Sequence, residues 1–397
     1  MKLRSWLKGS APACGIISAL VCGLAASQAP VKAPALTLAD PADAPQWESL
    51  AKTAGWQVIV PAAADNPDAR TQAMAEAVHK AVAAGAADPA RIYLVGRGSA
   101  SAMVFYAISR VPDLWAAGIA LEGTPQSAID TDRLFAANFQ HAPVLWVSAG
   151  AEDQALATGL KESGMNLEFR AAGPSVAGAS LLEWLGAHQR EEFPTEIDCE
   201  TNSPTFAGCF WIQMTKFDAT ERNDVVTSSR IAGAARPSLD LGGFGFRVGD
   251  PGPGVLVSFL PPKYAGPLKM GDRIMALDGR PLADARQYLA TMAKYTEEKP
   301  AVATIERGKD RLRLETRVIV PRRETIITAR VQAQYLPEEK QLQIVSRTVT
   351  EMKITVPPAW ADGGKLFWNG LALEKIDGPG CYVLSIDREL LRAARCQ

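Results

Sequence analysis

Between Trp47 and about Phe193 the sequence alternates short β-branched, apolar runs with stretches that repeat apolar residues at helical spacing. Parallel strands need a helix to return the chain, so this alternation predicts a parallel sheet covered on both faces. With 397 residues, 47% of them hydrophobic, the chain is long enough for several packed cores. The expected elements are strands at 56–60, 92–95, 117–121 and 144–147 and helices at 71–84, 100–110 and 181–190.

The N-terminus has the pattern of an export signal. Basic residues within the first eight positions precede the short apolar segment Ala13–Ala26, and Ala25 and Ser27 are small residues suited to a cut after Ser27. An uncleaved membrane anchor is the alternative, but about 14 apolar residues are too few to span a bilayer comfortably. We therefore predict a signal peptide over 1–27, a periplasmic or secreted protein, and no integral membrane segment after signal removal.

The cysteines that follow the signal form two locally close pairs. Cys199 lies near Cys209, and Cys381 lies near Cys396. In an oxidising compartment such pairs predict two structural disulfides. Neither pair has C-x-x-C spacing and no histidine is nearby, so no metal site is expected.

The charge balance excludes one class of partner. Lys and Arg number 42 against 43 Asp and Glu, for a net charge of −1 and no long block of one sign. A nucleic-acid-binding protein needs a basic footprint, which this chain lacks. Nucleic acid is therefore not an expected partner, and we expect no cofactor.

Changes in composition divide the chain into six expected parts. They are a signal peptide at 1–27, a linker at 28–45 with one short strand at 36–38, the α/β domain at 46–193, a linker with a disulfide at 194–235, a third unit at 236–321 and a small β-rich domain at 322–397. The last part reads as successive strands and ends in a stretch, 387–395, that we expect to be a helix bringing Cys396 over Cys381. The aromatics Trp360, Phe367 and Trp368 suit core packing there, with partner binding as the alternative.

Asp88–Gly123 carries the most specific local pattern in the α/β domain. It reads DPARIYLVGRGSASAMVFYAISRVPDLWAAGIALEG and resembles the strand, nucleophile elbow, helix and strand of secreted α/β-hydrolases, particularly polyhydroxybutyrate-depolymerase-like and dienelactone-hydrolase-like esterases. The resemblance covers about 140 residues and implies a truncated α/β-hydrolase-like sheet. It places Gly98 at the nucleophile position, and Ala100 and Ser101 where the family has glycines. A glycine has no group that can attack a carbonyl.

The other catalytic positions implied by the resemblance are also altered. Asp153 fits the acid position, whereas Pro174 stands where the histidine base is expected, and Asp40 lies in the loop that should supply an oxyanion donor. Ser99 and Ser101 are fallback nucleophiles, although serines near a helix N-terminus more often cap it. An activated serine needs a base within hydrogen-bond reach, and none can be placed.

Residues 239–320 resemble a PDZ domain of the bacterial periplasmic-protease kind. The pattern consists of a G-Φ-G-Φ loop, AGPLKMGDRI at 265–274 and ALDGRPL at 276–282, followed by a helix at 283–294 and a strand at 303–306. The expected peptide-binding residues are Gly243, Phe244, Gly245, Phe246, Arg247 and Val248. The resemblance implies that an extended peptide pairs with the strand at 246–248 while the loop amides hold its terminal carboxylate. A PDZ fold used only for internal packing is the alternative.

Together these patterns favour an exported, noncatalytic pseudo-hydrolase whose PDZ-like groove binds peptide or protein C-termini. The rival hypothesis is an active serine esterase or peptidase that uses Ser99 or Ser101 together with Asp153.

Overall fold

The structure is a computed structural model and describes residues 32–173, 178–233, 237–320, 326–360, 364–373 and 375–397. The expected signal peptide lies outside the described residues. The first domain is built on a six-stranded, entirely parallel sheet of order β2-β1-β3-β4-β6-β7. Its strands are β1 (Ala33–Leu38), β2 (Gln57–Ile59), β3 (Ala87–Arg97), β4 (Ala117–Leu121), β6 (Val144–Ser148) and β7 (Leu167–Ala171). The predicted parallel α/β sheet is confirmed.

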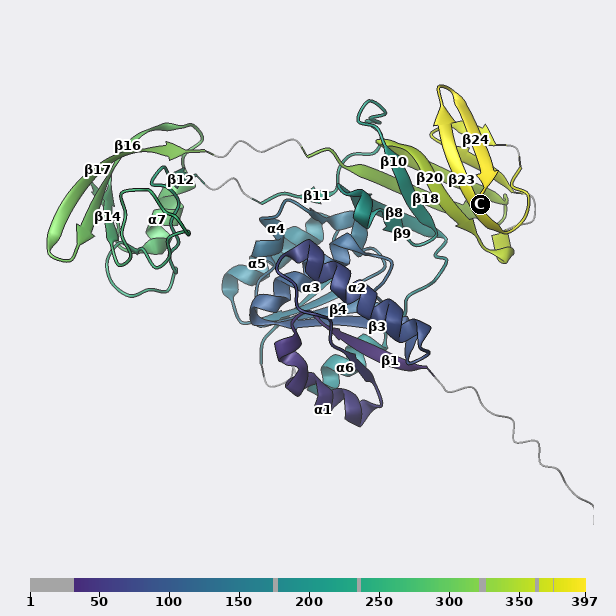
Figure 1. Cartoon of the computed structure of the whole chain (residues 1–397), viewed down its shortest axis with the longest axis horizontal. Helices are drawn as coiled ribbons and strands as arrows, with labels where there is room; N and C mark the ends of the chain where they lie inside the picture. The colour runs from purple at the N-terminus through teal and green to yellow at the C-terminus, as the bar shows by residue number, and fades with distance from the viewer. Residues whose placement is uncertain (1–31, 174–177, 234–236, 321–325, 361–363, 374) are drawn as a thin grey trace, which may run out of the picture. The chain divides into compact units, whose positions relative to one another are not determined.

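Helices cover both faces of this sheet (Figure 1). They are α1 (Ala44–Ala54), α2 (Pro67–Ala83), α3 (Ser101–Arg110), α4 (Gln126–Ile129), α5 (Ala151–Glu162) and α6 (Gly178–Gly186). Successive strand residues point to opposite faces, so Leu94 joins the core under α2 and α3 while Tyr93 and Val95 join the core under α1 and α6.

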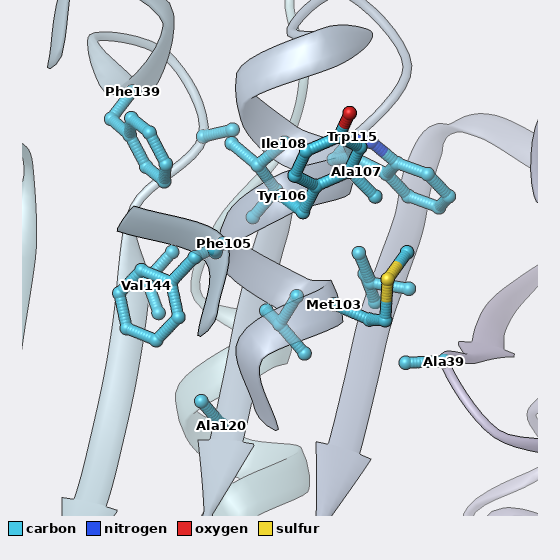
Figure 2. Packing of buried hydrophobic residues seen from close by; sticks show 14 of the residues in the cluster. Ala39, Met103, Phe105, Tyr106, Ala107, Ile108, Trp115, Ala120, Phe139 and Val144 are labelled. Carbon is cyan, nitrogen blue, oxygen red and sulfur yellow. The ribbon is translucent and has the colours of Figure 1, made fainter. Parts of the chain in front are cut away.

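Helix α3 is the most deeply buried element, with all ten of its residues buried. Its Phe105 packs edge-on against Trp146 of β6, with ring centroids 5.9 Å apart, and lies 6.4 Å from the Phe139 ring. Figure 2 shows Phe105 beside Val144 within this cluster. A helix held on every side fixes the turn at its N-terminus, which is where the candidate site lies.

The short strand expected at 36–38 is present and begins at residue 33, but the rest of the expected linker is wrong where the structure describes it. Residues 33–38 form β1, which is an inner strand because it pairs with both β2 and β3. Leu36 and Leu38 are fully buried, and α1 already begins at Ala44. The Ala- and Pro-rich composition suggests a linker, but Leu36 and Leu38 alternate with the small residues Ala35 and Thr37, and all four are buried, as in a strand covered on both faces.

The expected linker at 194–235 is also wrong, because residues 196–217 belong to a β domain with the end of the chain. One sheet has the order β22-β21-β19-β18-β8 and the other β24-β23-β20-β10-β9, and one apolar core joins them. The strands are β8 (Glu196–Thr201), β9 (Gly208–Cys209), β10 (Ile212–Phe217), β18 (Ala329–Leu336), β19 (Gln341–Arg347), β20 (Val349–Val356), β21 (Lys365–Trp368), β22 (Leu371–Leu373), β23 (Gly380–Asp387) and β24 (Leu390–Arg395). Trp368 is fully buried in this core, and Trp360 stacks on Tyr335 with ring centroids 4.6 Å apart.

Both predicted disulfides, Cys199–Cys209 and Cys381–Cys396, are confirmed. The helix predicted at 387–395 is wrong: the segment turns at Arg388, whose φ is +57°, and returns as β24 against β23. The Cys396 amide donates to the Cys381 carbonyl at 3.0 Å. A hairpin, and not a helix, therefore brings the second cysteine pair together.

Residues 238–320 fold around a core of their own. Their sheet has the order β12-β17-β16-β14-β13, and β15 also pairs with β14. The elements are β12 (Ser238–Leu239), β13 (Val255–Leu256), β14 (Arg273–Leu277), β15 (Arg280–Pro281), α7 (Ala285–Met292), β16 (Lys299–Arg307) and β17 (Asp310–Ile319). We call residues 238–320 the inserted module, because strands of the β domain precede and follow it in the sequence.

Candidate functional site

The turn between β3 and α3 has the shape of a nucleophile elbow, with Gly98 at its tip. Gly98 has φ +57°, in the left-handed region that favours glycine. A Cβ on Gly96 would lie 2.5 Å from the Ala100 carbonyl oxygen, and one on Gly123 would lie 1.9 Å from the Gly98 oxygen. A Cβ on Gly98 itself would meet nothing within 4 Å. The close packing around the elbow therefore depends on Gly96 and Gly123, while space remains for a side chain at the tip.

The two fallback serines lie in different environments. Ser101 is fully buried, and its hydroxyl donates to the Leu121 carbonyl at 2.6 Å, which ties α3 to β4. Ser99 is exposed. Of the two, only Ser99 is accessible to a substrate without opening the core.

A pocket of about 210 Å³ lies beside the elbow, at the carboxyl edge of the sheet. Trp47, Leu50 and Val147 contribute apolar walls to it. Arg97 and Glu122, which come at or directly after the ends of β3 and β4, contribute its charges. In parallel α/β sheets ligands bind at this edge, so the pocket is the candidate site.

An ion pair braces this pocket. The Arg97 Nε donates to Glu122 Oε2 at 2.7 Å and its Nη2 donates to Glu122 Oε1 at 2.8 Å, while its Nη1 donates to Gln46 Oε1 at 2.8 Å. Hydrogen bonding to Glu122 raises the pKa of Arg97. Since the guanidinium is already engaged by a bidentate partner, it is a poor free donor for a developing negative charge.

An acidic side chain contacts the backbone at the start of the elbow. The Asp43 carboxylate accepts from the Arg97 amide at 3.3 Å, and burial raises the pKa of Asp43 against the lowering effect of that amide. The predicted Asp40 instead caps the short helix that follows it, accepting from the Ala42 amide at 2.9 Å. An oxyanion is stabilised by donors, and the Asp43 carboxylate, which accepts from the amide of the residue before the elbow tip, is not one.

Asp153 lies near the carboxyl end of β6, in the first turn of α5, and accepts a hydrogen bond from Ser148. Pro174 lies outside the described residues. The three histidines are elsewhere: His79 is on α2, the His141 Nε2 lies 2.8 Å from the Glu196 carbonyl, and the His188 Nδ1 lies 2.8 Å from the Trp184 carbonyl. None of them lines the pocket beside the elbow.

In the inserted module, the predicted peptide-binding loop is braced from within. Gly243 has φ +79°, and the Gly245 amide donates to the Phe259 carbonyl at 2.8 Å. Phe244 and Phe246 pack on Tyr288 of α7, with ring centroids 6.4 and 5.5 Å away. Burial raises the pKa of Tyr288 to about 12.

The strand expected at 246–248 is not formed. Arg247 has no strand pairing, Val248 lies in a turn and is 43% exposed, and the bridge from Gly245 to Phe259 is isolated. Glycine weakens a strand, and the pairing of Gly245 with Phe259 stays isolated because the chain turns at residues 248–249.

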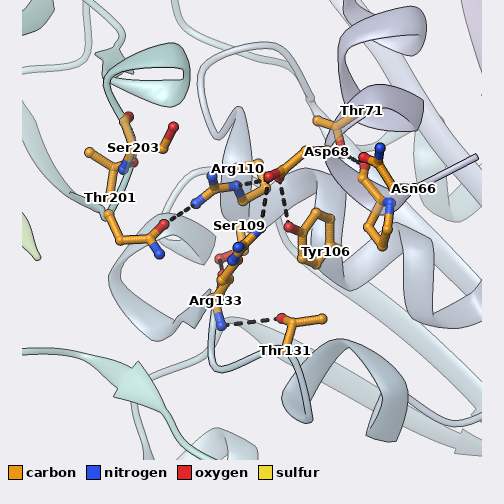
Figure 3. Close-up of polar contacts among 12 residues, drawn as sticks. Asn66, Asp68, Thr71, Tyr106, Ser109, Arg110, Thr131, Arg133, Thr201 and Ser203 are labelled. Atoms are coloured by element: carbon orange, nitrogen blue, oxygen red, sulfur yellow. Dashed lines mark hydrogen bonds and ion pairs between the residues drawn. The ribbon is translucent and has the colours of Figure 1, made fainter. Parts of the chain in front are cut away.

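Several polar residues that the motifs did not indicate organise the chain. Arg97 and Glu122 are two, and their positions at the ends of neighbouring strands are a usable sequence signal. A third is Arg110, whose side chain is 1% exposed and pairs with Asp68 at 3.2 Å (Figure 3). A fourth is Glu200, which is 1% exposed. Within the described ranges no group of three or more His, Cys, Asp or Glu side chains is placed to hold a metal, and no helix is long and apolar enough to cross a membrane.

No family model matches the chain, and no curated protein matches it. Among solved structures, a thermostable esterase is 14% identical over 40% of this chain and 55% of its own, with a TM-score of 0.28. Esterase PE8 is 15% identical over 39% of this chain and 91% of its own, with a TM-score of 0.30. Arabidopsis thaliana SOBER1 is 18% identical over 39% of this chain and 96% of its own, with a TM-score of 0.28. The chain thus spans about half the length of the thermostable esterase. At these scores the likeness decides nothing about chemistry, and the class defined by the geometry is a parallel α/β domain joined to a disulfide-bonded β domain.

Proposed function

We propose that the chain is an exported, noncatalytic protein in which an α/β-hydrolase-like domain accompanies a PDZ-like module that binds peptide or protein C-termini. The observation that carries the first half is Gly98. The elbow keeps its left-handed tip and the glycines that let it pack, yet the tip has no side chain. Without a hydroxyl or thiol at that point, the acyl-enzyme chemistry of a serine hydrolase has no attacking atom.

The surroundings of the elbow support the same proposal. A base must lie within hydrogen-bond reach of a nucleophile, and no histidine lines the pocket. Arg97 is held by Glu122, and the Arg97 amide faces Asp43. This arrangement stabilises the turn, and it would oppose an oxyanion.

Two observations support export to the periplasm or the exterior. The basic, then apolar, N-terminal sequence has the form of a cleavable signal. The two disulfides, which close loops with sequence separations of 10 and 15, are typical of an oxidising compartment.

The peptide-binding half rests on the loop at 243–246. Its two aromatic side chains pack against α7 and form an apolar floor. Within the described part of the chain, the Phe244 and Phe246 amides donate to no protein acceptor, whereas that of Gly245 is occupied. Two amides over an apolar floor suit a terminal carboxylate and the side chain next to it.

The alternative function is an active serine esterase or peptidase that uses Ser99. Its exposed position one residue past the elbow tip is the observation in favour. A fluorophosphonate probe and a broad panel of acyl esters, applied to the full chain, separate the two functions. We expect no labelling and no hydrolysis above the buffer rate; labelling that Ser99→Ala abolishes would establish the rival function.

Peptide binding is tested separately, by screening the full chain against a library of peptides with free C-terminal carboxylates. Val248→Glu should weaken any hit by about tenfold, because it places a charge beside an apolar groove. Val225→Glu is the matched control, since Val225 is 84% exposed and lies outside the module. A library without hits, or hits that bind equally well after amidation of the C-terminus, would refute the peptide half alone.

A further inference from the structure

A further groove lies away from both the elbow and the glycine loop. It measures about 640 Å³ and is lined by strands β8, β18 and β19 of the β domain together with residues 136–140 and 163–166 of the α/β domain. Pockets of 300–1,000 Å³ are typical of sites for small ligands.

The strands form one wall as a ladder of polar side chains. Glu196 of β8 pairs with Gln334 of β18, which pairs with Gln343 of β19. Two residues further along β8, Asp198 pairs with Gln332 of β18. These positions alternate with buried ones such as Ile197 and Ala333, so the polar residues share one face. Directly paired side chains stand about 5 Å apart, which spaces the amides regularly.

The two walls are tied together by hydrogen bonds. The Asn138 side chain donates to the Glu200 carbonyl at 2.8 Å and accepts from the Glu200 amide at 2.7 Å. At the other end of β8, the His141 ring contacts the Glu196 carbonyl at 2.8 Å. These bonds hold β8 against residues 138–141, so the groove is preformed.

The lining is largely uncharged and has hydrogen-bonding capacity to spare. Arg330 donates to both carboxylate oxygens of Asp198, at 2.8 and 2.5 Å, and so neutralises it. In the described residues, the side chains of Glu196, Gln334 and Gln140 make no hydrogen bond to protein. A glutamine amide both donates and accepts. A ligand that satisfies such a lining must itself carry many groups that donate and accept, with no negative charge.

We propose that this groove binds a neutral oligosaccharide. Hydroxyl groups both donate and accept, as the glutamine amides do, so a sugar can satisfy both kinds of group in this lining. An anionic ligand would face Glu196 unpaired, and an apolar one would leave the amides without partners. The site is separate from the proposed peptide groove, so either assignment can fail without the other.

Calorimetric titration of the full chain with cellotetraose, chitotetraose, maltotetraose and xylotetraose tests the proposal. At least one should bind, and Gln334→Ala should weaken it about 2- to 10-fold, the loss expected for one neutral hydrogen bond. The double variant Gln334→Ala/Gln343→Ala should lose about 5- to 100-fold. Gln213→Ala is the matched control: it removes an exposed glutamine from β10, in the other sheet, and should leave the affinity unchanged.

Tetralysine and a sulfated tetrasaccharide complete the panel. Binding of tetralysine alone would show that the groove recognises cations through Glu196, and binding of the sulfated sugar alone would show an anion site; either result overturns the proposal. So does the absence of binding by all four neutral sugars up to roughly 5 mM. Binding that Gln213→Ala weakens as much as Gln334→Ala places the sugar elsewhere and is equally negative.

Discussion

The buried carboxylate of Glu200 should hold together the two points where the chain leaves and re-enters the β domain. It accepts from the Ser228 hydroxyl at 2.6 Å, from the Ser229 amide and hydroxyl at 2.6 and 2.8 Å, and from the Thr328 hydroxyl at 2.5 Å. Residues 228–229 precede the inserted module and Thr328 follows it. We therefore predict that Glu200→Ala loosens both segments while leaving the core of the module intact.

The expected loss of local stability in Glu200→Ala depends on which donors lose their acceptor. The three hydroxyls can rotate towards other acceptors, but the Ser229 amide cannot, and hydrogen bonds to a charged group are worth about 1.5–3 kcal/mol each. Counting the amide in full and the hydroxyls in part gives about 3–4 kcal/mol. That free energy corresponds to an increase of about 10²- to 10³-fold in hydrogen exchange at the Ser229 amide. Glu200→Gln keeps one acceptor oxygen and should give a smaller increase.

Native-state hydrogen exchange with fragment-resolved mass spectrometry measures this directly. Glu196→Ala is the matched control, since it removes an exposed carboxylate from the same strand and should shift local stability by no more than about 0.5 kcal/mol. If Glu200→Ala changed exchange at 228–230 by less than about threefold, or if Glu196→Ala had an equal effect, the carboxylate would not be the tie.

Three further predictions concern stability. Arg110→Ala should lower the free energy of unfolding in urea by about 2–4 kcal/mol, because it removes a buried guanidinium that donates to Asn202 at 2.7 Å and packs against the Phe206 ring. Arg286→Ala, at an exposed position, is the control and should have little effect. Equal unfolding midpoints for the two variants would contradict this prediction. Reducing the Cys381–Cys396 bond should lower the free energy of unfolding by about 3 kcal/mol, and an unchanged midpoint with and without reductant would count against it. Burial raises the pKa values of Tyr93 and Tyr288 to about 12; because the unfolded tyrosines ionise near 10, the stability from both is full below pH 10 and is lost as pH rises through 12. Burial also raises the pKa of Tyr106, so alkaline titration at about 295 nm should show three of the seven tyrosines ionising late, and a single transition near 10 would refute it.

Features whose interacting residues lie close together in the sequence could be predicted from the sequence. The elbow at Gly98 and both cysteine pairs depend on short spacings, and the alternation of strands and helices predicted the parallel sheet. By contrast, β8 pairs with β18 across more than a hundred residues, and no local pattern indicates so distant a partner. The segment 387–395 shows that pairing with another strand can override a local preference for a helix. Its composition suits a helix, yet pairing with β23 and the covalent bond at Cys396 select a strand.

The residues of the candidate site also divide into those that a local motif predicts and those that depend on distant partners. Gly98, Ser99 and Ser101 follow from one motif, and burial then separates the two serines. The brace between Arg97 and Glu122 needs two strand ends to lie side by side, which the parallel pairing of β3 with β4 provides. Val248 shows how tertiary context overrides a motif, because a loop that matches the G-Φ-G-Φ pattern leaves it in a turn and not in a strand.

The module's place in the sequence has a physical explanation in how its ends meet. Within the module, Ser238 at its start pairs with Ile319 at its end, so its two ends are adjacent. In the β domain, Ser229 and Thr328 contact the same carboxylate, so the gap left by the module is equally narrow. An insertion whose ends meet, placed where the host's ends also meet, adds little loop-closure entropy and lets each core form by itself. Glu200 adds a fixed point at this junction, because its carboxylate binds both host segments beside the strand β18 with which β8 pairs.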